Sequence, residues 1–422
     1  MDRKLKAIAL VLVMAVICVV SSDNAYAGNG TRFIGFSARD SGMAGATTAS
    51  SEDTSCLVKN PAGLVRIGNR IDLEYLNIIP NNVSLDTEGP NVALLGNIPF
   101  VNRGLKQKST IGYIPGGNGG ISYRIPGTEK YPVSVGCGAF TMGGVAVNYP
   151  SSRMNSALTG DYDKMADIRS MRIAPGIAVA FNDKLSFGVT GNINIQGFRT
   201  NFATTNFAGL HYLETAGEGD WDFTGGGGFN VGVLYKLCDM LGLGASYESH
   251  QWMGHHHKYK DCVPYLDGPP VVNMGVSINP IKNLELTYDT RYVNWTDIKV
   301  ARLSPANGGF GWRDQWVFAT GGEYTTFKEK LKLRMGYMYG KSPIQPHFVF
   351  ANALIPLITE HHLAAGFSYL LTNNLSIDLE WQHAFKSVMS DNGAGDVYSI
   401  YGNGTKVTAA ADVIGVGIGY KF

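Results

Sequence analysis

Apolar residues that alternate with small or polar ones are the feature of this sequence that most limits its fold. The last residues, Ile414–Phe422, show the pattern most clearly, because every even position is apolar or aromatic and every odd position is glycine or lysine. Residues 330–339 and 375–382 repeat it, with charged or polar side chains on one face and apolar ones on the other. A period of two is that of a β-strand whose faces meet different surroundings, as in the wall of a membrane barrel.

Segments of this kind recur from about Ile71 to Phe422, and about fourteen can be counted. Their centres fall near residues 76, 121, 140, 175, 190, 230, 245, 275, 289, 320, 335, 366, 380 and 415. A closed barrel in a membrane favours an even number of strands, since every strand edge must be paired within the hydrocarbon. We therefore predict an all-β fold, a transmembrane antiparallel β-barrel of about 14 strands.

The connections between these segments alternate in length. Residues 182–184, 239–240, 282–283 and 372–374 are short and polar, which is typical of periplasmic turns. The connections around 199–221, 249–270, 300–314, 340–359 and 386–406 are long and are assigned to the outside. A soluble β-sandwich also alternates and is the alternative fold.

The first residues predict export. Met1–Lys6 carries three basic side chains, the run Ala7–Val20 is apolar, and Ala25–Ala27 has the small-x-small form of a signal peptidase site. We expect residues 1–27 to be a cleaved signal peptide. The alternative, a membrane anchor, needs roughly 20 apolar residues, more than Ala7–Val20 provides.

Removal of that leader would leave 32 of the 35 basic and 32 of the 34 acidic residues. A neutral chain argues against nucleic acid as a partner. Cysteines would remain at positions 56, 137, 238 and 262, and their spacing leaves the question of disulfides open. Glycine, with 53 of 422 residues, is about twice as frequent as average, which suits strands that need small side chains on one face.

Residues 28–70 differ from the rest because they do not read as membrane-spanning strands. They contain Ser41–Ala46 and Lys59–Leu64, two stretches of mostly small residues. We predict that residues 28–70 form a plug, or hatch, inside a barrel made of residues 71–422.

These two stretches, with Glu52 and Asp53 between them, resemble the N-terminal hatch of the FadL/TodX family of outer-membrane transporters. Trp295, Ser342–Pro343 and the C-terminal Gly419–Phe422 are similar to further landmarks of that family. The resemblance covers essentially the whole chain. It implies a fourteen-stranded barrel closed by the hatch, with hydrophobic substrates leaving sideways through a gap at a kinked third strand.

The candidate third strand is Pro132–Tyr149. Glycines within a strand weaken the ladder and permit a bulge, and they occur here as Gly136, Gly138, Gly143 and Gly144. The alternative is that they only face a crowded interior.

The hatch motif that the resemblance marks is Asn60, Pro61, Ala62 and Gly63. We expect the Asn60 amide to tether the hatch to the kinked strand by bonding backbone groups that a broken ladder leaves unpaired. An ordinary turn is the alternative.

For substrate capture the family uses an apolar groove between outer loops. The loop that matches by position carries Phe202, Phe207, Leu210, Tyr212 and Leu213, and exposed apolar clusters commonly mark binding surfaces. These side chains could instead pack on each other.

A fatty acid also needs a cation for its carboxylate. Arg199 and Arg313 lie where family members carry basic residues, and either could pair with it. The alternative is that each forms an ordinary salt bridge or is solvated in the lumen. After Ser342–Pro343, where fatty-acid members have a further arginine, this chain has Ile344–Phe350. That departure favours a neutral hydrocarbon.

Three further patterns in the sequence could form a metal, phosphate or catalytic site. His255–His257 is interpreted as a solvated loop and not as a metal site, and Gly225–Gly228 has no phosphate-loop signature. An outer-membrane enzyme built on His361, His362 or His383 is a rival hypothesis, but no GxSxG or comparable motif accompanies them. A general porin is a second rival.

We therefore predict a passive channel, without enzymatic activity, cofactor or metal, in the outer membrane of a Gram-negative bacterium. Long-chain fatty acids are the preferred substrates, and monoaromatic hydrocarbons are the alternative. Expected partners are the hydrophobic substrate, outer-membrane lipid and lipopolysaccharide, and the barrel assembly machinery that would recognise Phe422. The protein is expected to be a monomer.

Overall fold

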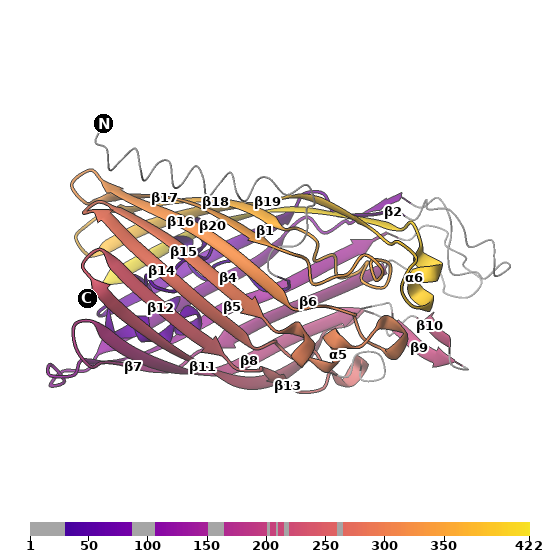
Figure 1. The fold of residues 1–422 in the computed structure, drawn as a ribbon, viewed down its shortest axis with the longest axis horizontal. Helices are drawn as coiled ribbons and strands as arrows, with labels where there is room; N and C mark the ends of the chain where they lie inside the picture. Colours follow the sequence, from indigo (N-terminus) through magenta and orange to yellow (C-terminus); the bar gives the residue numbers. More distant parts are fainter. Residues whose placement is uncertain are drawn as a thin grey trace.

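The computed structural model describes residues 30–86, 106–150, 164–200, 203–207, 210–214, 219–259 and 265–422. These residues form a closed, 14-stranded antiparallel barrel with a long axis that is horizontal in Figure 1. The predicted leader, residues 1–27, lies outside the described residues. Among those that are described, no helix has the length and apolar character needed to cross a membrane.

The barrel closes because its last strand pairs with its first. Each strand is antiparallel to its neighbours, and the ladder between Arg70 and Lys421 completes the circle. In order around the wall the strands are β1 (Arg70–Pro80), β4 (Ile114–Arg124), β5 (Val133–Tyr149), β6 (Lys164–Ile173) with β7 (Gly176–Ala180), β8 (Leu185–Thr200), β11 (Asp222–Cys238), β12 (Leu241–Glu248) with β13 (Trp252–Met253), β14 (Val271–Ile281), β15 (Leu284–Val293), β16 (Gln315–Thr326), β17 (Leu331–Gly340), β18 (His361–Leu370), β19 (Leu375–Ser390) and β20 (Lys406–Lys421).

The predicted fold class is confirmed, and every predicted strand centre has a counterpart in this wall. One segment differs, because the strand expected around residue 175 is split at Ala174–Pro175 into β6 and β7. Proline lacks the N–H group that a ladder needs, so a break there is expected of a strand interior. Two short strands that were not predicted, β2 (Ser84–Asp86) and β3 (Lys106–Lys108), extend the wall beside β20.

The two ends of the barrel differ as the connection lengths predicted. Tight turns after β7, β11, β14 and β18 gather at the left of Figure 1, together with the C-terminus. We call this the turn end. The opposite end, the loop end, carries the hairpin of β9 (Ala203–Phe207) and β10 (Leu210–Glu214), and the helical segments η2 (His257–Tyr259), η3 (Trp295–Asp297), α5 (Lys299–Arg302), η4 (Pro305–Asn307) and α6 (Val397–Gly402).

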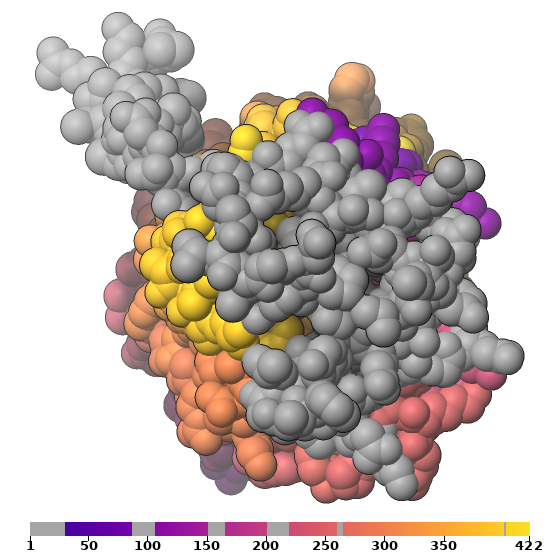
Figure 2. Space-filling view, turned by 90° about the vertical axis from the view of Figure 1, so that its right-hand side faces the viewer, coloured from indigo at the N-terminus to yellow at the C-terminus, as the bar shows by residue number. Residues whose placement is uncertain are grey.

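Figure 2 looks onto the loop end. The loops of the C-terminal half, in orange and yellow, form one part of its rim, and the segment near residue 250, in salmon, forms another. Hydrophobic residues from these loops and from the upper strands build the largest buried cluster, which contains Trp295, Trp312 and Ile344. The loops therefore fold over the barrel mouth instead of extending away from it.

The outer surface of the barrel carries the apolar side chains that strand parity predicts to face outward. Ile414, Val416, Ile418 and Tyr420 on β20 are all about half exposed, as expected of side chains that face lipid. On β17 the alternate residue Arg334 is buried toward the interior, where it pairs with Glu323 at 2.7 Å. The alternation predicted from the sequence thus separates a lipid face from a polar interior.

Residues 30–69 lie inside the barrel and form the plug. They contain α2 (Ala38–Gly42), which packs on β17–β20, and α3 (Cys56–Lys59) followed by η1 (Pro61–Val65), which packs on β5, β7, β8 and β11. Ser37 caps α2 by accepting a hydrogen bond from the backbone N–H of Asp40. Pro61 starts η1 at a position where no N–H group is needed.

Glycines in the wall let the plug backbone come close. A Cβ atom added at Gly188 on β8 would lie 2.3 Å from the carbonyl carbon of Pro61, and one at Gly232 on β11 would lie 2.0 Å from Oδ1 of Asn60. No side chain fits at these distances. Part of the high glycine content is therefore explained by contact between the plug and the wall.

Buried ion pairs hold the other side of the plug. Arg39 of α2 pairs with Glu285 at 2.7 Å and with Glu323 at 3.2 Å, and Lys59 pairs with Asp289 at 3.5 Å. The carboxylates of Glu52, Glu285 and Glu323 come within 4.8 Å of one another, and Arg39, Lys332 and Arg334 offset their charge. The plug is thus bound to β15, β16 and β17 by charge, and to β8 and β11 by close packing.

The described cysteines are free. Cys56 is buried in the plug, and Cys137 and Cys238 are exposed on the wall. Cys262 lies outside the described residues.

Candidate functional site

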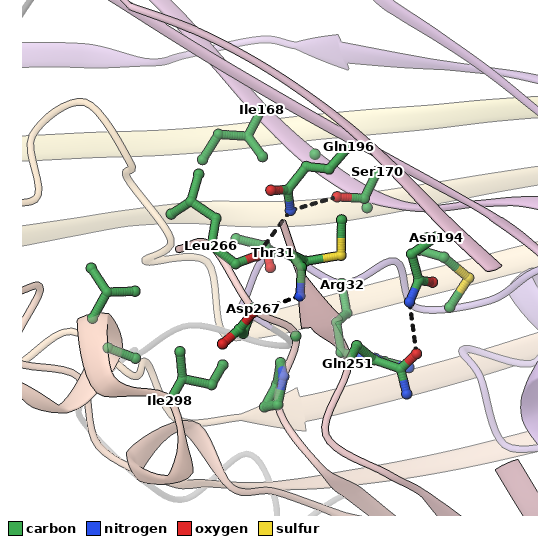
Figure 3. A pocket seen from close by; sticks show the side chains of 18 of the residues that line it. Thr31, Arg32, Ile168, Ser170, Asn194, Gln196, Gln251, Leu266, Asp267 and Ile298 are labelled. Atoms are coloured by element: carbon green, nitrogen blue, oxygen red, sulfur yellow. Dashed lines mark hydrogen bonds between the residues drawn. The ribbon is translucent and has the colours of Figure 1, made fainter. Parts of the chain in front are cut away.

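Two neighbouring cavities lie in the barrel interior, and both are lined in part by residues of the plug. The first, here called the outer cavity, has a volume of about 100 Å³. Loops of the C-terminal half supply its apolar wall, and the close-up in Figure 3 shows part of its lining from β6, β8 and the segment before β14. The apolar side chains that line it include Trp295, Ile298, Phe310, Trp312 and Ile355.

The amide side chains that line the outer cavity are bonded to protein partners. Gln196 donates to Ser170 Oγ at 3.3 Å and to the Leu266 carbonyl at 3.1 Å, and Asn194 donates to Gln251 Oε1 at 2.8 Å (Figure 3). A buried polar group that already has its partner gains little from a ligand. A ligand in this cavity therefore gains mainly from apolar contact.

A buried charge cluster forms the floor of the outer cavity. Glu248 accepts from Arg32 at 2.8 and 2.7 Å, one bond to each carboxylate oxygen, and from Arg172 at 2.9 Å. Two guanidinium groups on one carboxylate leave a net positive charge. Among the residues that the structure describes, Arg172 Nη1 has no hydrogen-bond partner, and this atom is inaccessible to solvent.

The second cavity, here called the inner cavity, has a volume of about 190 Å³ and is lined by the plug and by strands β1, β4, β5, β19 and β20. Its apolar lining includes Leu76, Ile78, Ile114, Val147, Leu357 and Ala409. His362, Glu380 and Gln382 supply its polar side. Arg32 and Gly144 line both cavities, so the two lie back to back.

A short piece of the plug separates the cavities. The Phe33 N–H donates to the Met142 carbonyl and the Gly144 N–H donates to the Thr31 carbonyl, each at 3.1 Å, so residues 31–33 pair with β5 as an added strand. A Cβ atom at Gly143 would lie 1.9 Å from the Thr31 oxygen. Only glycine at position 143 permits this pairing.

Strand β5 bends where the plug segment joins it. The ladder between β4 and β5 runs from Arg124↔Ser134 to Asn118↔Phe140 and stops there, and the ladder between β5 and β6 shifts register between Thr141 and Gly143. Beyond this bulge, the segment between β3 and β4 is bonded to β5, where the Thr110 N–H donates to the Asn148 carbonyl at 2.8 Å. Between these two points, residues 111–116 and 142–147 have no mutual ladder among the described contacts. We call this unpaired stretch of the wall, which lies beside the inner cavity, the gap.

The glycines predicted for this strand divide into two groups. Gly143 and Gly144 lie at the bulge, where they meet the plug segment. Gly136 and Gly138 lie in the regular ladder, opposite Ser122 and Gly120 of β4. Only the first group is at the gap.

The hatch motif contacts a different part of the wall from the one expected. Asn60 Nδ2 donates to the Val233 carbonyl on β11 at 3.1 Å and to the Thr48 carbonyl within the plug at 2.8 Å, and Oδ1 accepts from the Ala62 N–H at 3.2 Å. The predicted tether from Asn60 to the third strand is therefore wrong, because its partners are on β11 and within the plug. Pro61, Ala62 and Gly63 begin η1, beside the close approach to Gly188.

Neither arginine predicted to bind a carboxylate lines a cavity. Arg199 has the parity of Ile193 and Ile195, which are exposed on the lipid face of β8, and it pairs with Asp167 at 3.2 Å. Arg313 donates through Nε to the Ser342 carbonyl at 3.0 Å. The expected placement of Arg199 at a substrate carboxylate is therefore wrong, because the residue lies on the outer face. Arg313 is bonded to the backbone of an outer loop.

The apolar loop expected to capture substrate is only partly described. Phe207 ends β9, and Leu210, Tyr212 and Leu213 belong to β10, with Leu210 opposite Phe207. Phe202 lies outside the described residues. A role for these residues in capture remains a prediction.

The histidines do not form one site. His256 is fully buried, with Nε2 3.0 Å from Gln196 Oε1, so the expectation of a solvated loop is wrong for this residue. Burial lowers the pKa of His256. His362 lines the inner cavity, whereas His361 and His383 lie on the opposite parity of their strands, where His383 pairs with Asp412 at 2.9 Å.

The sequence reasoning missed the charge cluster and much of the apolar wall. Glu248 and Arg172 occupy interior positions of β12 and β6, and an isolated charge at such a position is the signal that could have revealed them. Arg32 and Trp312 come from irregular segments, where no periodic pattern exists to place them.

Together these features define a class of protein: a membrane-spanning β-barrel with an internal plug, whose interior holds apolar cavities next to a gap in the wall. The sequence profile of the outer membrane protein transport family (OMPP1/FadL/TodX) matches residues 18–422. The chain belongs to this family, and it is an outer-membrane protein. No matching relative was found among curated protein sequences.

Solved structures of the same fold share little sequence with it. A FadL homologue of Pseudomonas aeruginosa is 16% identical with a TM-score of 0.64, over 93% of this chain and 100% of that one. The Pseudomonas putida toluene transporter TodX is 16% identical with a TM-score of 0.64, over 94% and 99%. The Ralstonia pickettii toluene transporter TbuX is 16% identical with a TM-score of 0.63, over 92% and 99%.

Proposed function

We propose that the protein is a passive channel that carries small neutral hydrophobic molecules through the outer membrane, with monoaromatic hydrocarbons as the preferred class. The observation that carries this proposal is the pair of neighbouring apolar cavities, of about 100 and 190 Å³, the second of which lies beside the stretch where β4 and β5 are unpaired. An apolar cavity of about 150 Å³ is known to hold benzene. The cavities thus have the scale of a single aromatic ring.

The route favoured by the geometry is lateral. From the outer cavity a ligand would pass the plug segment 31–33 into the inner cavity, and then leave between β4 and β5 into the bilayer. Every step keeps the ligand away from water, and burial of apolar surface is worth about 25 cal/mol per Å². The axial route is unfavourable, because the cavity between the plug and the turn end is lined by charged groups such as Arg39, Asp72 and Lys332.

The state of the cations supports a neutral substrate. Arg199 faces outward, Arg313 is bonded through Nε to a loop carbonyl and lines neither cavity, and Arg32 and Arg172 share Glu248. Two structural relatives are described as toluene transporters, which agrees with a substrate of this kind.

Long-chain fatty acid uptake is the second candidate. It is favoured by the net positive charge under the outer cavity, where Arg172 Nη1 lacks a partner. A modest movement of Arg172 would present that donor to a carboxylate. The two candidates differ in what they require of Arg172.

Uptake in bacteria without their own channels of this family tests the proposal. Cells that express the protein are given labelled toluene or labelled oleate, and outer-membrane levels are checked on immunoblots. We expect faster uptake of toluene than in cells with empty vector, no gain for oleate, and little effect of Arg172→Met on toluene. If the wild type takes up oleate but not toluene, and Arg172→Met loses oleate uptake, the proposal is wrong and fatty-acid uptake is the function.

A further inference from the structure

Two arginines form a cationic cluster on the outside of the barrel, near the loop end. Arg169 on β6 binds Asp167 through Nε and Nη2, each at 3.0 Å, and Arg199 on β8 binds the same carboxylate at 3.2 Å. Trp221, just before β11, stacks against both guanidinium groups, with 5.1 Å from its ring to Arg169 and 4.6 Å to Arg199. We call these four residues the rim cluster.

Strand parity shows that the rim cluster faces outward. Arg169 has the parity of Met171, and Arg199 that of Ile193 and Ile195, all exposed on the lipid face. Phe223, two residues after Trp221, is 64% exposed. None of the four cluster residues lines either substrate cavity.

The position of the rim cluster relative to the membrane follows from the length of the band of exposed apolar residues on β8. On β8 the exposed apolar residues run from Phe187 to Ile195, about 26 Å along the strand at about 3.3 Å per residue. Strand tilt reduces this to about 20 Å across the membrane, close to the band height of about 25 Å in outer-membrane barrels. Arg199 lies four residues beyond Ile195, at the level of the lipid headgroups on the loop side.

The rim cluster carries a net positive charge that it presents to the outside. Asp167 is only 2% exposed, whereas the side chains of Arg169 and Arg199 are 42% and 28% exposed. Asp220 beside Trp221 pairs with Lys258 at 3.3 Å and so adds no net charge. Asp222, on the other side of Trp221, accepts from the Lys258 N–H at 2.8 Å and has the opposite strand parity to the exposed Phe223. The buried carboxylate and the tryptophan ring hold the guanidinium groups in place, and their outer N–H groups can bind an anion.

We propose that the rim cluster binds the phosphate groups of lipopolysaccharide in the outer leaflet. Guanidinium groups match phosphate oxygens with paired hydrogen bonds, and lipid A carries its phosphates on sugars at the headgroup level. The acyl chains of the same molecule would lie along the apolar band that begins at Ile195 and Met171. The protein is thereby anchored at a fixed height in the membrane.

Binding of lipid A to the purified protein in detergent tests this proposal. Native mass spectrometry compares lipid A that carries both phosphates with lipid A from which they were removed, and inorganic phosphate serves as competitor. The wild type is expected to bind the phosphorylated lipid at least tenfold more tightly than the other, with no competition from millimolar phosphate. Equal binding of the two lipids would overturn the proposal, and competition by phosphate would reduce the cluster to a general anion site.

Two variants distinguish an effect of the cluster's charge on lipid binding from an effect of misfolding. The triple variant Asp167→Asn, Arg169→Gln, Arg199→Gln leaves no unpaired buried charge, so it is expected to fold and to lose the preference for phosphorylated lipid A. The matched control, Lys236→Gln with Lys282→Gln, removes two exposed positive charges at the turn end and is expected to keep it. A triple variant that folds and keeps the preference would contradict the proposal. Toluene uptake should be unchanged in both, which distinguishes this site from the channel itself.

Discussion

Asn60 links the plug to the barrel wall through a single side chain. Its amide bonds the Thr48 and Val233 carbonyls, and its own carbonyl accepts from Ala62. Each buried hydrogen bond is worth about 0.5–1.5 kcal/mol. Asn60→Ala should therefore weaken the docking of η1 by about 1–3 kcal/mol. We expect this as faster hydrogen exchange in residues 56–65. The control Asn307→Ala, in an exposed loop, should leave the exchange of these residues unchanged. Equal exchange in the two variants would contradict this role.

Glu360, in the outer loop between β17 and β18, should make that loop sensitive to pH. Burial raises its pKa to about 9, and Oε1 accepts from the Ser342 N–H at 2.9 Å. The folded state therefore keeps a proton that the unfolded chain, with a pKa of about 4.3, has lost. The contribution of Glu360 to stability must fall as pH rises between these values. In detergent, the melting temperature of Glu360→Gln relative to wild type should rise from pH 6 to pH 9, and parallel profiles would rule the effect out.

At the residue scale, strand parity predicts on which face of the barrel wall a side chain lies, and it could have been applied to Arg199. Counting by two from Ile195 puts Arg199 on the lipid face, yet a match of position with family members assigned it to the substrate. The bond from Asn60 to Val233 was beyond the sequence, because it joins residues far apart in the chain. The ion pairs that join Arg32, Glu248 and Arg172 were beyond it for the same reason, although the interior positions of Glu248 and Arg172 could have been read from the strand pattern.

At the element scale, the bulge in β5 and the added strand of residues 31–33 depend on each other. The bulge frees the backbone groups of Met142 and Gly144, and the plug segment takes them up. Gly143→Ala would place a methyl group 1.9 Å from the Thr31 oxygen, so it should displace the segment. We expect at least tenfold faster amide exchange at Phe33 and Gly144. Gly191→Ala on β8, where a Cβ meets nothing within 4 Å, is the control, and unchanged exchange in Gly143→Ala would refute the coupling.

The elements that the sequence predicted are those on which the membrane imposes a pattern. Each strand that faces lipid on one side alternates strictly, so its centre could be counted. The break at Pro175 was missed because the alternation on both sides continues across it. The strands β2 and β3, of three residues each, are too short to show a period.

At the scale of the whole molecule, the fold is shared with transporters that are only 16% identical. Lipid outside and a packed plug inside constrain the architecture, whereas cavity lining is set by loops that vary freely. For this reason the fold and the family could be predicted from the sequence. The substrate could not be predicted in the same way, and our proposal of a hydrocarbon rests on the cavities.

Blocking the inner cavity tests the lateral route most directly. Ala146 on β5 is buried and lines the inner cavity beside the gap, and Ala139 on the same strand is exposed on the lipid face. Uptake of labelled toluene is measured in cells with equal outer-membrane levels of wild type, Ala146→Trp or Ala139→Trp. Our account predicts that Ala146→Trp reduces uptake at least tenfold toward the level of empty vector and that Ala139→Trp leaves it unchanged. Wild-type uptake by a folded Ala146→Trp variant would contradict it.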